Sequence, residues 1–336
     1  MITDTSDRIL RYIRENKQAR VHDLVELFKI SQVAIHKQLN KLLSQGKIQK
    51  VGKPPKVFYV PVITRQVSIL GRASILSAST AKYVNTNYLY ITPQGSMLYG
   101  MEGFQAWTKS INEETRVVSL AEEYVKTHRQ AESNRSSQGW IDATEKMQST
   151  FPNNSCIKKL LYADFYSIPK FGKTKLGQLV LYAKQSQNRD LIDQVITEVK
   201  PIIERIAVVY NIDTLAFVPP SVPRKLQFMQ EFNNKLLVGF PRIKFTKAYV
   251  GNVVVAQKTL SRLEERVENA RDTIFVDANH SPLIVNNVLL IDDAVGSGAT
   301  LEETAKKLKQ LKLVSGVIIG FAIVGSMKGF EVIREV

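Results

Sequence analysis

The stretch that most constrains this chain is residues 288–301, where an apolar run meets two carboxylates and a loop of small residues. Four aliphatic residues, 288–291, precede Asp292 and Asp293, and the small residues 296–300 follow, before a segment with helical apolar spacing. This order predicts a buried strand, a tight turn and a helix N-terminus. Backbone N–H groups in such a turn can surround an anion, whereas adjacent carboxylates suit sugar hydroxyls or a metal ion. The pattern therefore favours a ligand with both a phosphate and a ribose diol.

This stretch resembles the phosphoribosyl-diphosphate (PRPP) signature of type I phosphoribosyltransferases, in which four hydrophobic residues, an acidic pair and a Thr/Ser-Gly-x-Thr loop follow one another. The resemblance implies that the acidic pair faces the ribose 2′ and 3′ hydroxyls and that the loop holds the 5′-phosphate. It assigns PRPP binding to Asp292, Asp293, Ala294, Val295, Gly296, Ser297, Gly298, Ala299 and Thr300. The alternative is an ordinary parallel strand that ends in a turn. A Walker loop is excluded, because no Gly-Lys-Ser/Thr follows.

Length and composition predict a cytoplasmic protein of two or three domains that does not enter a membrane. The chain has 336 residues and a single cysteine, Cys156, which cannot form an intramolecular disulfide and so fits a reducing compartment. The polar, acidic start gives no sign of a signal peptide. The longest apolar run, 314–324, is shorter than the ~20 residues that a membrane-spanning helix needs.

The net charge of +15 is concentrated near the N-terminus, where residues 1–62 hold 12 Lys/Arg against 5 Asp/Glu, a net +7. Positive charge gathered in a small domain is typical of nucleic-acid binding. The alternative is a basic face that is merely solvated.

Residues 1–62 also have the pattern of three short helices and a hairpin. Helical apolar spacing follows the N-cap residues 5–7, recurs at 21–29, and recurs again between Ser31 and Gly46; β-rich runs at 48–51 and 56–60 then flank a Gly/Pro turn. This order resembles the winged helix-turn-helix of bacterial transcription regulators. The resemblance implies binding of double-stranded DNA through Gln32, His36, Lys37, Asn40, Lys41, Lys50, Lys53 and Lys56. The alternative is a winged helix that mediates protein–protein contact or dimerisation.

The remaining chain is expected to be α/β. Residues 63–155 give the weakest signal, a hairpin pattern and a helical pattern before a polar stretch, and we interpret them as a linker or dimerisation segment. From 156 to 336, apolar strands, among them 214–218 and 245–250, alternate with helical patterns. Such alternation predicts a phosphoribosyltransferase-like domain with a parallel sheet, which binds its ligand at the carboxyl ends of the strands.

Within the phosphoribosyltransferases, residues 156–330 most resemble the ComF-type competence proteins. Support comes from Val218-Pro219-Pro220-Ser221 with Arg224, from Lys158-Lys159-Leu160-Leu161-Tyr162, and from the Gln, Arg and Asn residues between 257 and 269. The resemblance implies a diphosphate site at Ser221, Arg224, Arg262 and Arg266, with Mg²⁺ bound together with PRPP. Alternatively, the arginines belong to a solvated amphipathic helix and pair with Glu264, Glu265 and Glu268.

The sequence favours a homodimeric, DNA-binding transcription regulator whose second domain binds PRPP or a nucleoside phosphate as effector. The alternatives are an active phosphoribosyltransferase and a ComF-type protein of DNA uptake. Enzymatic relatives usually carry Thr or Asp where this chain has Gly296, and no nucleobase-selecting residue stands out. The sequence therefore names neither a catalytic residue nor a protein metal site, and it leaves enzymatic turnover open.

Overall fold

The computed structural model describes residues 4–62, 76–152, 155–236, 239–277 and 284–327. The chain divides into two compact units, Met1–Arg72 and Ala73–Val336. Each unit encloses hydrophobic clusters of its own, as independently folded domains do.

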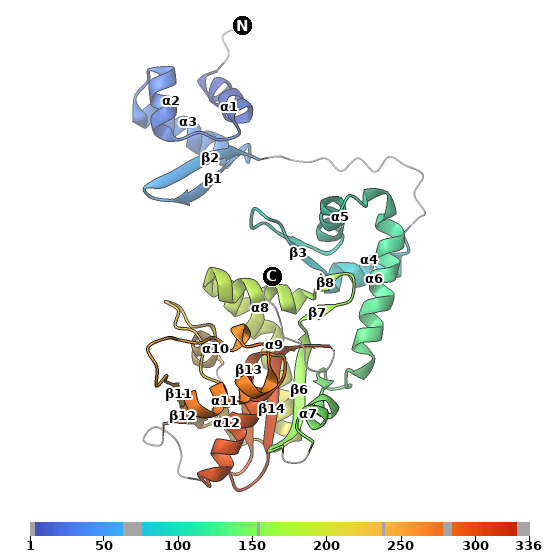
Figure 1. The fold of residues 1–336 in the computed structure, drawn as a ribbon. Coiled ribbons are helices and arrows are strands. Elements are labelled where there is room, and N and C mark those ends of the chain that lie inside the picture. Colours follow the sequence, from blue (N-terminus) through green and yellow to red (C-terminus); the bar gives the residue numbers. More distant parts are fainter. Residues whose placement is uncertain (1–3, 63–75, 153–154, 237–238, 278–283, 328–336) are drawn as a thin grey trace. The chain divides into compact units, whose positions relative to one another are not determined.

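The first unit consists of three helices and a hairpin: α1 (Thr5–Asn16), α2 (Val21–Phe28), α3 (Gln32–Ser44), β1 (Ile48–Lys53) and β2 (Lys56–Pro61) (Figure 1). Side chains cap two of the helices, since Asp4 accepts the N–H of Ser6 and Ser31 accepts the N–H of Ala34. The apolar faces meet in a core that contains Ile9, Ile13, Leu24, Ile35, Leu39, Leu42, Ile48 and Tyr59. This is the order of elements that the sequence predicts.

The second unit begins with the region interpreted from sequence as a linker or dimerisation segment. Its elements are α4 (Ala78–Asn87), β3 (Leu89–Ile91), β4 (Met97–Tyr99), α5 (Gly100–Ser110), the 3₁₀ helix η1 (Glu114–Arg116), α6 (Val117–Ala131), the 3₁₀ helix η2 (Glu132–Asn134), β5 (Ile141–Asp142) and α7 (Thr144–Thr150). Ile141 pairs with Tyr162 of the main sheet, and the ring of Phe171 packs on those of Phe104 and Tyr124. Residues 76–152 therefore fold as part of the second unit, whereas their role in dimerisation stays a prediction.

A six-stranded sheet forms the centre of the second unit. Its strands are β6 (Ile157–Phe165), β9 (Thr214–Phe217), β10 (Arg242–Ile243), β13 (Val288–Val295), β14 (Ile318–Gly325) and β5, in the order β10-β9-β13-β14-β6-β5. All neighbours are parallel except β5, which runs antiparallel to β6. The parallel α/β arrangement agrees with the expectation from sequence and places β13 in the middle of the sheet.

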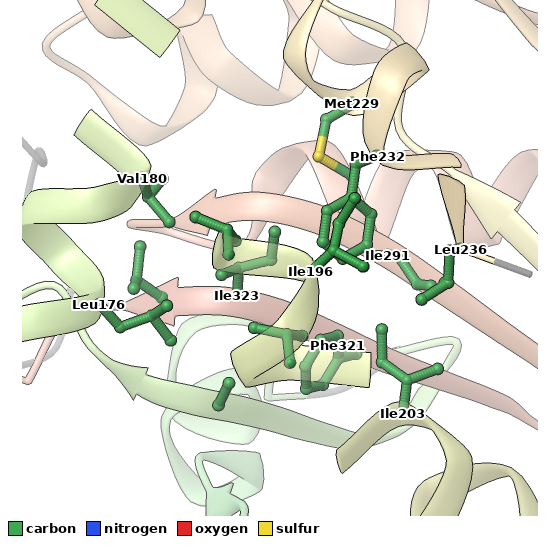
Figure 2. Packing of buried hydrophobic residues seen from close by; sticks show 14 of the residues in the cluster. Leu176, Val180, Ile196, Ile203, Met229, Phe232, Leu236, Ile291, Phe321 and Ile323 are labelled. Carbon is green, nitrogen blue, oxygen red and sulfur yellow. The ribbon is translucent and has the colours of Figure 1, made fainter. Parts of the chain in front are cut away.

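Helices cover both faces of this sheet. Successive residues of β13 point to opposite sides, and because 288–291 are all apolar, each face of the strand packs against helices. Leu289 and Ile291 pack with the helices α8 (Lys175–Ser186), α9 (Arg189–Val209) and α10 (Phe228–Lys235). Figure 2 shows this layer, with Ile291, Phe321 and Ile323 facing side chains of these three helices. Val288 and Leu290 instead pack with α12 (Ala299–Gln310).

One strand differs from the expectation. The run at 245–250 does not enter the main sheet; instead β11 (Phe245–Lys247) pairs antiparallel with β12 (Ile274–Val276). The sheet edge is formed by β10, whose Ile243 is buried opposite Ala216. The remaining elements are β7 (Ser167–Ile168), β8 (Gly172–Lys173), η3 (Gln257–Thr259) and α11 (Leu263–Thr273).

Candidate ligand pocket and nucleic-acid interface

The loop between β13 and α12 forms one wall of a pocket at the carboxyl end of the central strand. Gly298 has a φ of 81°, in the left-handed region that glycine adopts without strain, and stands at the N-cap of α12. The hydroxyl of Ser297 accepts the N–H of Ala299 at 3.3 Å. The small residues and the N-terminus of a 12-residue helix give this wall the backbone N–H groups and the dipole that attract anions.

The acidic pair stands beside this loop at the end of β13. The N–H of Asp293 donates to Oδ1 of Asp292 at 2.8 Å. Burial raises the pKa of the Asp292 carboxyl and the Asp293 carboxylate raises it further, while Lys184 and Lys247 oppose the rise. Asp292 is thus held in an environment that disfavours its charge, a common property of binding and catalytic sites.

Two lysines of the pocket were not predicted from sequence. Nζ of Lys184, in the last turn of α8, lies 2.9 Å from Oδ2 of Asp293, and only 20% and 17% of the two side chains are exposed. Lys247 of β11 is half-buried and donates to Oδ1 of Asn269 at 2.9 Å. Burial lowers the pKa of Lys247 to about 8, although the Asp292 carboxylate opposes this effect. Neither lysine lies in a recognisable motif. Each comes from an element distant in sequence, α8 or β11, and only the fold brings it next to β13.

The pocket collects most of the residues that the sequence suggests for PRPP. Its lining includes the whole stretch 292–300 together with Ser221, Arg224 and Arg266. Arg224 donates to the backbone carbonyl of Lys184 at 2.7 Å, and Arg266 donates to that of Leu260 at 2.9 Å. Four cations, Lys184, Arg224, Lys247 and Arg266, therefore surround two carboxylates, which leaves an excess of positive charge for an anionic ligand.

Arg262 differs from the other proposed diphosphate residues, since it is not among the residues that line the pocket. Its guanidinium pairs with Glu265 at 2.8 Å, and its side chain is 73% exposed. The two residues form a capping box at the start of α11. For Arg262 the arrangement matches the alternative interpretation, a solvated helix with internal ion pairs.

Further lining residues give the pocket an apolar wall and a polar amide. Val222, Phe228 and Met229 supply the apolar part. Gln257 donates through Nε2 to the carbonyl of Arg266 at 3.0 Å, while its buried Oε1 accepts no hydrogen bond from the described residues. Gln257 belongs to the stretch that resembles ComF-type proteins, so that resemblance was the one available signal for it.

The helix α7 supports the loop from behind. A Cβ atom at Gly298 would lie 2.8 Å from Sδ of Met147. Nζ of Lys146 donates to the hydroxyl of Ser326 and, at 3.2 Å, to its carbonyl. Ser326 in turn donates its N–H to the carbonyl of Val295 at 2.9 Å. The region 144–150 thus contacts the loop directly.

In the first unit, α3 presents a polar face. Gln32, His36, Lys37 and Asn40 are exposed, whereas Ile35, Leu39 and Leu42 on the opposite side are buried. Lys50, Lys53 and Lys56 are exposed on the β1–β2 hairpin. Lys41 is less available, because its ammonium lies 2.8 Å from the Asp4 carboxylate that caps α1.

Comparison with known proteins agrees with a helix-turn-helix in the first unit. Residues 6–52 match the DeoR-like helix-turn-helix domain. No curated protein matches the chain. The match supports a transcription regulator that binds double-stranded DNA through its first unit. Within the described part of the chain, no helix is long and apolar enough to cross a membrane.

Proposed function

We propose that this protein is a DNA-binding transcription regulator whose second unit binds PRPP or a nucleoside 5′-phosphate as its effector. The observation that carries the proposal is one pocket in which an acidic pair, a small-residue loop at a helix N-terminus and four cations lie together. Each group of residues suits a different part of such a ligand.

The 5′-phosphate would lie against the loop 296–300, where backbone N–H groups and the dipole of α12 favour an anion. The ribose hydroxyls would donate to Asp292 and Asp293. A diphosphate would be neutralised by Arg224, Arg266 and Lys247, with Ser221 beside them. Arg262 is left out of this assignment, because it pairs with Glu265 outside the pocket.

The resemblance to phosphoribosyltransferases implies that Mg²⁺ binds together with PRPP. In the described part of the chain, no group of three or more His, Cys, Asp or Glu side chains is placed to hold a metal ion. The acidic pair offers two carboxylates, and Lys184 already pairs with one of them. We therefore assign Mg²⁺ chiefly to the oxygens of the ligand's diphosphate, as is usual for this ion.

Binding can regulate only through a difference in affinity between two conformations of the protein. A ligand that bridges the loop, the acidic pair and α8 would order these elements together. In a homodimer, the conformation with higher ligand affinity would then hold its two DNA-binding units at a different spacing from the other conformation. This is the regulatory step that we propose.

Titration calorimetry with PRPP and Mg²⁺ tests the effector site. The double variant Asp292→Asn, Asp293→Asn should bind at least tenfold more weakly, because a hydrogen bond to a charged group contributes about 1.5 kcal/mol or more. The matched control is Arg262→Gln, which changes a charge outside the pocket and should bind like the wild type. Equal affinity of the wild type and the double variant would rule out this site.

A second experiment tests regulation. Fluorescence anisotropy with a duplex selected from a random library should show that PRPP changes the affinity of the wild type for DNA. The same addition should have no effect on the double variant, whose own DNA affinity without PRPP should be normal. DNA binding that is indifferent to PRPP in the wild type would contradict the effector role.

A further inference from the structure

An exposed valine stands at the start of α3, the last helix within the DeoR-like helix-turn-helix match at residues 6–52. Val33 is the second residue of α3, and 79% of its surface is exposed. It is the one apolar side chain among the exposed residues of this helix, which are Gln32, Val33, His36, Lys37, Asn40, Lys41 and Ser44. The core of the unit is built by the opposite face of α3, so Val33 adds nothing to it.

The residues around Val33 are polar or basic, as on a surface that contacts DNA bases. His36 and Lys37 follow it by three and four residues, and such residues are neighbours on a helix. No acidic residue occurs in α3. Val33 is therefore an apolar side chain among side chains that donate hydrogen bonds, on a helix without an acidic residue.

A valine gains little in this position from the fold alone. Its β-branched side chain forms helices less readily than alanine or an unbranched side chain. Exposed apolar surface becomes favourable when a partner removes it from water. In the major groove thymine alone presents a methyl group, while guanine presents two acceptors that suit a lysine.

We propose that Val33 is a specificity-determining residue that contacts the C5-methyl group of one thymine in the recognised DNA. This inference rests on the proposed function, since it requires α3 to lie in the major groove as in other helix-turn-helix domains. Lys37 and His36 would then contact bases or phosphates next to that thymine. The contact makes the protein distinguish thymine from uracil at one position.

The test uses the full chain and a duplex enriched from a random library. Each thymine of the enriched duplex is replaced in turn by deoxyuridine, which removes only the methyl group, and dissociation constants are measured by fluorescence anisotropy. For the wild type, one replacement should weaken binding about fourfold, the effect expected for one buried methyl group. Val33→Ser should bind the thymine and uracil duplexes equally at that position.

The matched control is Val51→Ser, which alters an exposed valine of β1 in the same unit, 46% of whose surface is exposed. This variant should keep the fourfold preference for thymine, whatever its overall affinity. Circular dichroism should show both variants folded, since each changed side chain lies outside the core.

The outcomes separate this inference from the proposed function. If the library enriches no sequence, the proposed sequence-specific DNA binding is contradicted, and this inference fails with it. Enrichment of a duplex in which no thymine can be replaced with a measurable loss would overturn the role of Val33 alone. The same holds if Val33→Ser retains the wild-type sensitivity to uracil.

Discussion

The ammonium of Lys184 lies 2.9 Å from the carboxylate of Asp293, although the two residues come from α8 and from the central strand of the sheet. Asp293 is thereby matched with a positive charge, while its neighbour Asp292 has a raised pKa because of burial and the adjacent carboxylate. A pair of like charges at the end of a buried strand costs stability, and proteins accept such costs at binding sites.

The raised pKa of Asp292 predicts that Asp292→Asn stabilises the second unit at neutral and alkaline pH. A carboxyl whose pKa is higher in the folded than in the unfolded state favours folding at low pH. That contribution is lost as pH rises from the ordinary aspartate value through the raised one. The stability advantage of the variant should therefore grow with pH over this range and then level off.

Urea denaturation followed by tryptophan fluorescence measures this effect, because both tryptophans, Trp107 and Trp140, lie in the second unit. Asp193→Asn is the control, since Asp193 pairs with Lys235 on the surface, outside the pocket lining. A stability difference between wild type and Asp292→Asn that does not change with pH would contradict the raised pKa.

Replacement of Gly298 should destabilise the loop. Gly298→Ala forces a non-glycine residue to a φ of 81° and brings its Cβ to 2.8 Å from Sδ of Met147. The left-handed conformation alone costs about 1–2 kcal/mol, and PRPP affinity should fall as well. Gly251→Ala should be nearly neutral in urea denaturation, because nothing lies within 4 Å of the added Cβ.

The basic hairpin should contribute affinity without specificity. Replacing Lys53 and Lys56 by Ala should weaken binding to all duplexes alike. The plot of log association constant against log salt concentration should become less steep by about 0.9 for each phosphate that is no longer neutralised. Gln32→Ala should instead change the preference among sequences, because Gln32 is exposed at the start of α3. Titrations at several salt concentrations distinguish these effects, and an unchanged slope in the double lysine variant would exclude binding of phosphates there.

Turnover of PRPP should be weak or absent. Gly296 offers no side chain where the phosphoribosyltransferase signature that the sequence resembles usually has a hydroxyl or a carboxylate, and transfer requires both reactants to be held in line. The check is diphosphate release from PRPP and Mg²⁺ in the presence of each common nucleobase. Base-dependent release at about 1 s⁻¹ or faster, a rate typical of enzymes, would make the phosphoribosyltransferase alternative the better one.

Local patterns account for the parts of the fold that were predicted from sequence. The helices and hairpin of the first unit follow from caps such as Ser31 and from apolar spacing within short segments. The buried strand β13 with its turn is equally local. Lys184 and Lys247 carried no such signal, because their role depends on which strands become neighbours in the sheet.

Ambiguity between two local interpretations explains the remaining differences. Arg262 fits a diphosphate site or a capping box equally well in sequence, and only the fold shows its guanidinium against Glu265. The region 76–152 looked like a linker because its apolar residues pack with strands that come much later in the chain. Leu89 illustrates this, since it belongs to the same hydrophobic cluster as Ile319 and Phe321 of β14.

The packing of α7 against the β13–α12 loop decides where the chain can be cut for protein engineering. A fragment that starts at Cys156 would keep every residue of the pocket lining, yet it would lack Met147 behind Gly298 and Lys146 beside Ser326. It would also expose the edge of β6 that β5 covers. A fragment meant to keep this pocket intact therefore begins with the second unit, before α4. A fusion joined at residue 156 would have the pocket lining without the α7 residues that pack behind it.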